Sequence, residues 1–302
     1  EQRCAQWGSV ELLEYCEFRD NYLREAISDL ARAAPTWFVQ NCVAMLRDGD
    51  ASARGRPLPW QAKEAALFAA TASVEVLLSR VLAPPGAAPP AGAAELSAWL
   101  PPLLEAALTS TASSSSAACE ALMIRARCEL VESLTPWLAL DPAAHGLAPA
   151  LTSIMPAISY QAPVTADAAL SCLTQLCRRC AVEMSRDELL IQALLDMLST
   201  AFPLITDMAG SHSRVERRCG LLTAVGGVIV EAPAAVERFF APVIAALEHA
   251  RAGLQAHAAA TRSHLTAAAH ELAARLDETA AALAPLKPLP KPNLVALLTH
   301  LW

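Results

Sequence analysis

Hydrophobic residues recur along this chain with the period of an α-helix. One stripe falls at alternating steps of four and three residues and comprises Leu67, Thr71, Val74, Leu78 and Val81. That spacing places its members on one face of a helix. Comparable apolar stretches follow one another along nearly the whole chain, separated by Pro, Gly or Ser, and no hydrophobic strand run alternates with them. Each helix is therefore expected to bury its apolar face against helices that are near in sequence.

The breaks in this pattern predict where helices begin and end. Pro35 is expected to divide 21–47 into two helices, and Pro156 to kink or end the helix at 147–158, because proline lacks an N–H group. The other predicted helices lie at 60–82, 103–108, 119–137, 163–183, 187–202, 213–230 and 233–284, the last with a break at Gly253. Outgoing helices recur about every 40 to 55 residues, which fits the HEAT class of repeats.

These repeats predict an all-α fold. We expect a right-handed HEAT-type superhelix of about five to six helical hairpins, with the second helix of each hairpin on the concave face. Residues 1–302 are expected to form one continuous array, with a flexible insert at 83–94 (APPGAAPPAGAA) and a Pro-rich linker at 285–292 (PLKPLPKP). The chain is also expected to be a fragment, since it starts at Glu1 without a signal-peptide pattern and stops at Trp302 within an apolar pattern.

Composition supports helices and narrows the classes of partner. The chain is 54% hydrophobic but only 5% aromatic, and Ala and Leu, which favour helices, dominate. Its net charge is −7, with 17 acids and 11 bases in residues 1–150 against 13 and 12 in residues 151–302. This acidity argues against direct nucleic-acid binding and is compatible with basic protein partners. No uncharged apolar run reaches the length of a membrane span, and nine irregularly spaced Cys predict reduced thiols in the cytosol or nucleus.

Cys177 and Cys180 have the spacing of a metal or redox pair. Two thiols three residues apart on a helix share a face, so they could supply half of a tetrahedral zinc site. Cys172 lies about 140° around the helix, and no His or second Cys pair is near in sequence. A redox pair would be expected at the start of a helix that follows a strand. Buried packing is therefore the favoured interpretation, and no metal or cofactor is expected.

Two further polar features favour a structural role. The four histidines of the Ala-rich tract are separated by eight, seven and six residues, and they are His249, His257, His264 and His270. These steps miss the spacing that places two imidazoles on one metal, so solvated helix faces are expected. Ser113–Ser116 could be phosphorylated, but a Ser run between helices is first of all a loop.

Three arginines of one predicted helix, Arg214, Arg217 and Arg218, could bind an acidic or phosphorylated segment of a cargo protein. The favoured interpretation is that they lie on an outer, solvated helix surface. The Gly pair within Val225–Val228 lacks the spacing of a phosphate-binding loop and is expected to allow close helix packing. No Gly-x-Ser-x-Gly, His-Glu-x-x-His or Walker pattern occurs, so catalysis is not expected, and no catalytic residue is assigned.

Several segments together resemble one family. Tyr15–Arg19 reads Tyr-Cys-Glu-Phe-Arg and Trp60–Ala69 reads Trp-Gln-Ala-Lys-Glu-Ala-Ala-Leu-Phe-Ala. The later matches are Trp137-Leu138 followed by Asp141-Pro142, Ala168–Cys180, Leu276-Asp277 and Leu301-Trp302. In order and approximate spacing, these segments resemble the transportin-SR and importin-thirteen branch of the importin-beta (karyopherin) superfamily. The insert at 83–94 and the Ala-rich stretch at 256–282 depart from the family pattern.

The resemblance implies the middle part of a nuclear transport receptor. Such a receptor binds protein cargo on its curved surface, contacts nucleoporins, shuttles between nucleus and cytoplasm, and releases cargo when Ran-GTP binds repeats that lie mainly upstream of this chain. Neither direct nucleic-acid binding nor a membrane location is implied. Two other hypotheses stay open: a general HEAT scaffold for multi-subunit assembly, and an enzyme built on the Cys177–Cys180 pair, which would require bound zinc.

Overall fold

The computed structural model describes residues 14–15, 17–47, 58–82, 90–111, 117–159, 162–205 and 212–232, with positions 252, 274 and 277. Every regular element among them is helical, and no strand occurs in these ranges. The elements in chain order are the π-helix η2 (Phe18–Leu23), α2 (Arg24–Ala33), α3 (Pro35–Leu46), α5 (Trp60–Val81), α6 (Ala93–Ser97), α7 (Leu100–Thr109), α8 (Ala117–Leu138), α9 (Pro142–His145), α10 (Leu147–Ile154), the 3₁₀-helix η3 (Met155–Ser159), α11 (Pro163–Arg179), α12 (Ala181–Arg186), α13 (Glu188–Ile205) and α14 (His212–Val230). The predicted all-α class is confirmed.

Proline sets several of the helix boundaries. α3 begins with Pro35 and α11 with Pro163, where the missing N–H and the fixed φ of proline suit the first helical position. α10 ends at Ile154, and the chain continues as the tighter η3 around Pro156. The predictions of a break at Pro35 and a helix end at Pro156 are both confirmed.

Two predicted boundaries are wrong. The helix expected at 163–183 is broken at Cys180, where φ is −112° and ψ is 18°, and the chain continues as α12. The predicted insert 83–94 includes the start of α6, because Gly92 turns the chain at a φ of +81° and Ala93 is buried immediately after it. Residues 83–89 of that insert and the predicted linker 285–292 lie outside the described residues.

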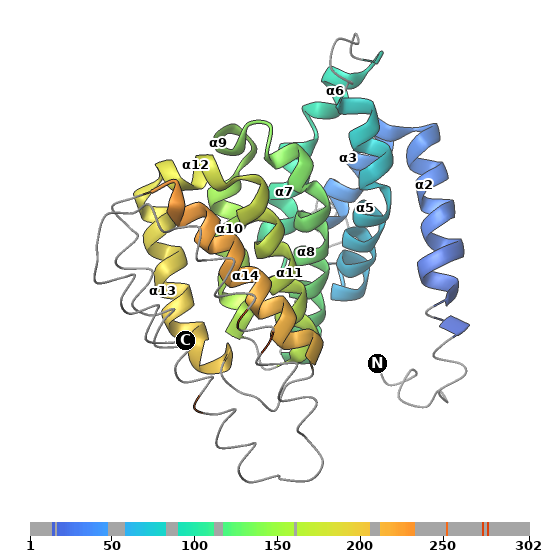
Figure 1. Ribbon diagram of the computed structural model, residues 1–302. Helices are drawn as coiled ribbons and strands as arrows, with labels where there is room; N and C mark the ends of the chain where they lie inside the picture. Colours follow the sequence, from blue (N-terminus) through green and yellow to red (C-terminus); the bar gives the residue numbers. More distant parts are fainter. Residues whose placement is uncertain are drawn as a thin grey trace. The chain divides into compact units, whose positions relative to one another are not determined.

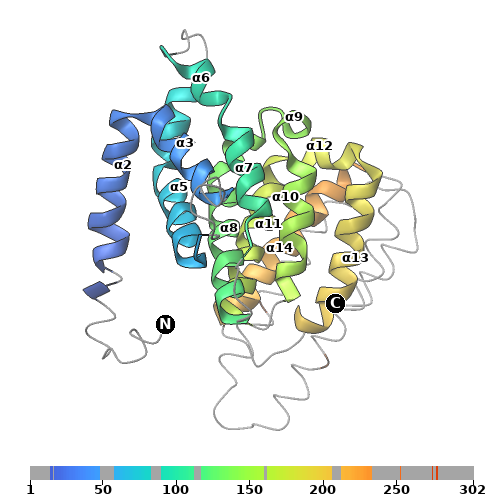
Figure 2. The ribbon, with the colours of Figure 1, turned by 180° about the vertical axis from the view of Figure 1, so that it is seen from behind.

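The chain divides into two compact units, Glu1–Trp137 and Leu138–Trp302. In the first unit, α2 packs on α5 and on α3, and α3 packs in turn on α5 and α7. Figures 1 and 2 show α2 beside α5 and α3 beside α7. Its core is aliphatic and includes the fully buried Leu67, Leu77 and Leu103. In this unit α2 and α3 are thus both packed against α5, the next long helix in sequence.

The second unit is built around α11. This helix packs on α14 and on η3, while α10 and α13 also contact η3 and α12 packs on both α13 and α14. Its core contains Leu151, Leu173, Leu176 and Cys177, all with no exposed surface. Within the described part of the chain, no helix is both long and apolar enough to cross a lipid bilayer.

Truncating a leucine to alanine should destabilise the protein much more at a buried position than at an exposed one. Leu77 is 1% exposed, so Leu77→Ala should leave a cavity and lower the free energy of unfolding by about 2 to 5 kcal/mol. Leu30 on α2 is 47% exposed and serves as the matched control, for which Leu30→Ala should change the value by less than about 0.5 kcal/mol. Urea unfolding followed by circular dichroism measures both. Equal losses at the two positions would contradict the assigned packing of α5.

Candidate functional site

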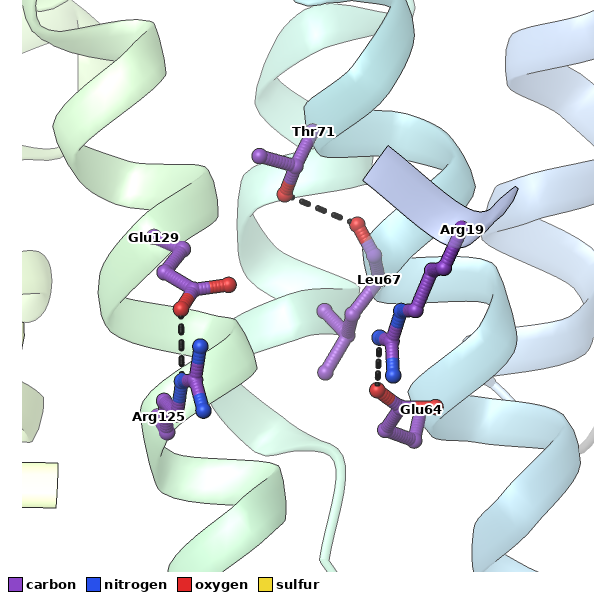
Figure 3. Close-up of polar contacts among 6 residues, drawn as sticks. All are labelled: Arg19, Glu64, Leu67, Thr71, Arg125 and Glu129. Atoms are coloured by element: carbon purple, nitrogen blue, oxygen red, sulfur yellow. Dashed lines mark hydrogen bonds and ion pairs between the residues drawn. The ribbon is translucent and has the colours of Figure 1, made fainter. Parts of the chain in front are cut away.

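The two segments that open the family-like pattern meet in the first unit. Arg19, on η2, donates a hydrogen bond from Nη2 to Oε1 of Glu64 on α5 at 2.5 Å, and the two groups form an ion pair (Figure 3). The guanidinium carbon of Arg19 also lies 4.3 Å from the centre of the Phe68 ring, one helical turn further along α5. A carboxylate and an aromatic ring at i and i+4 therefore hold one arginine between them.

The surroundings of Arg19 favour the charged form of its guanidinium. Partial burial by itself lowers the pKa of the guanidinium, but the hydrogen bond and the charge of Glu64 outweigh this, and the net pKa lies above its ordinary value. Tyr15 and Glu129 add smaller contributions in the same direction. The side chains of Arg19 and Glu64 are 30% and 22% exposed, so water screens the pair only in part. We therefore expect the Arg19–Glu64 pair to contribute more to the free energy of unfolding than an ordinary surface ion pair does.

α8 adds a second polar pair close to this cluster. Nε of Arg125 donates to Oε1 of Glu129 at 2.7 Å, one turn apart on the helix (Figure 3). Both side chains are more than a third exposed. This pair is an ordinary solvated i,i+4 contact, and its contribution to folding is small.

Two other cations hold the end of α7. Nη2 of Arg127 donates to the carbonyl oxygen of Ser110 at 2.5 Å, and Nζ of Lys63 donates to that of Thr111 at 3.4 Å. Lys63 is only 3% exposed, and burial lowers the pKa of Arg127 from its ordinary value. Positive groups at the carboxyl end of a helix bind its unpaired carbonyls and complement its dipole. These cations therefore have a structural role and connect α5 and α8 to the residues just after α7.

The Cys177–Cys180 pair lies in the core of the second unit. Cys177 has no exposed surface and Cys180 is 2% exposed. Burial raises the pKa of Cys177 to about 12 and that of Cys180 to about 11, so both thiols are protonated near neutral pH. In the described ranges, no three His, Cys, Asp or Glu side chains are grouped so that they could hold a metal ion. Burial and protonation favour the packing interpretation.

The structure describes only some of the other residues that the sequence analysis singled out. The four histidines and Ser113–Ser116 lie outside the described residues. Arg214, Arg217 and Arg218 lie on α14, but their side chains are not described. Close helix packing at the Gly pair is wrong for Gly227, because a Cβ built there would meet no described atom within 4 Å.

The structure also shows surface features that the sequence did not single out. The first unit has a groove of about 500 Å³ between α2, α5 and α8, lined by Arg24, Ser28, Thr71, Glu75, Ser133 and Pro136 among others. The hydroxyls of Ser28, Thr71 and Ser133 donate to helix carbonyls and are already satisfied, so Arg24 and Glu75 supply the charge of this groove.

A groove of about 450 Å³ in the second unit lies between the turns that precede α10 and α13, with Leu147, Asp187 and Leu189 in its lining. Leu189 is 82% exposed. Oδ1 of Asp187 accepts hydrogen bonds from the backbone N–H groups of Leu189 and Leu190, so this carboxylate caps α13.

Exposed aromatic rings form a third surface feature. Phe18, Tyr22 and Trp37 are 52%, 66% and 55% exposed. Helical periodicity places such residues on a face, but it cannot tell an occupied face from an open one. The signal that could have found Phe18 and Tyr22 is their four-residue spacing beside the inward-facing Arg19.

Comparison with models of known protein families finds no match to this chain. Comparison with curated proteins finds no match either.

A double-mutant cycle tests the contact between Arg19 and Glu64. Arg19→Ala, Glu64→Ala and the double variant should give a coupling energy of about 1 kcal/mol, because the pair is partly buried and hydrogen-bonded. The exposed pair between Arg186 and Glu183, at 2.6 Å, is the matched control and should give no more than about 0.5 kcal/mol. Arg19→Lys should lose part of the stabilisation, since an ammonium does not stack on Phe68 as a guanidinium does. A coupling near zero for Arg19 and Glu64 in urea unfolding would contradict the contact.

Thiol reactivity tests the packing of the cysteines. The pKa of Cys177 rises from 9.0 to about 12, so near pH 7.5 its thiolate population should fall by about a thousandfold on folding. Alkylation by iodoacetamide should therefore be very slow in the folded protein and fast in urea, as mass spectrometry of peptides carrying Cys42, Cys128 and Cys177 can measure. Raising the pH to about 9.5 should speed the reaction of the unfolded chain but leave the folded thiols largely unreacted. Rapid native labelling of Cys177 would show that it is accessible and ionised.

Proposed function

We propose that this chain is part of a nuclear transport receptor of the importin-beta superfamily, folded as an array of HEAT-type helical hairpins. The observation that carries the proposal is the contact of Arg19 with Glu64 and Phe68. Trp60–Ala69 is the strongest match of the resemblance, and Tyr15–Arg19, another of its segments, lies far from it in sequence. A chance likeness gives no reason for these segments to touch, whereas a shared fold does.

The packing of the first unit supports the array. α2 and α3 form one antiparallel pair, and both contact α5, the first helix of the following pair. α3 also packs on α7. Such contact between successive pairs is the packing from which helical-repeat arrays are built. A right-handed superhelix of about five to six hairpins is the architecture that we propose for the whole chain.

The mechanism that follows is one of binding, without bond chemistry. Each pair in an array contacts only its neighbours, so small changes at each interface add up to a change in curvature. Cargo proteins would bind the curved surface, and Ran-GTP bound mainly by repeats outside this chain would favour a curvature with lower affinity for cargo. Contacts with nucleoporins and shuttling between nucleus and cytoplasm belong to the same proposal.

Binding to the two nucleotide states of Ran tests this function. The intact protein that contains this chain should bind Ran-GTP at least about tenfold more tightly than Ran-GDP, because release of cargo requires a differential affinity for the two states. Biolayer interferometry with immobilised Ran in each state measures the ratio. Equal binding, or none, would reject the transport role and favour the general HEAT scaffold. The Arg19→Ala variant should keep the preference for Ran-GTP, because Arg19 contributes to the fold and not to binding of Ran.

A further inference from the structure

We draw no further inference here: the strongest candidate, the groove of about 450 Å³ in the second unit between the turns that precede α10 and α13, has the exposed Leu189 in its lining, but nothing in the structure shows what covers it.

Discussion

The fold of this chain depends on one constraint: each helix must bury its apolar face against helices close to it in sequence. α2 is covered by α3 and α5, and α11 is covered by α14 and η3. Burial of aliphatic side chains supplies most of the driving force, at about 25 cal/mol for each Å² removed from water. Since Ala and Leu dominate the chain, the helices need few specific contacts to pair. Specific polar contacts such as the one between Arg19 and Glu64 can then fix which helices meet and in what register.

Helix boundaries marked by proline could be predicted from the sequence, because proline changes the backbone itself. Pro35, Pro156 and Pro163 all act where the sequence analysis placed them. The break at Cys180 could not be predicted, because neither proline nor glycine marks it and the packing of α12 on α13 and α14 accompanies it. Local propensity therefore determines the boundaries that strong helix breakers mark, and tertiary packing decides others.

The candidate site was predictable only in its parts. The sequence drew attention to Arg19, Glu64 and Phe68 as members of two family-like segments, but gave no reason to bring them together. Their contact depends on the packing of α2 on α5, which is a tertiary property. The same limit applies to Phe18 and Tyr22, because only a structure can tell which side of a helix remains open. The Cys177–Cys180 pair shows the converse, since its spacing suggested chemistry and its burial favours packing.

Burial determines which charged groups of the first unit are paired within the fold. Lys63 and Arg127 bind backbone carbonyls beyond α7, and Arg19 binds Glu64, so each of these cations has a partner within the fold. A buried cation must be compensated in this way, because leaving it unpaired costs far more than an ordinary hydrogen bond returns. Acidic groups such as Glu14 and Glu17 are instead exposed and can stay hydrated at no such cost. Burial therefore decides which charged groups need a partner within the fold, whereas exposed groups such as Arg32 and Arg125 can be hydrated as well as paired.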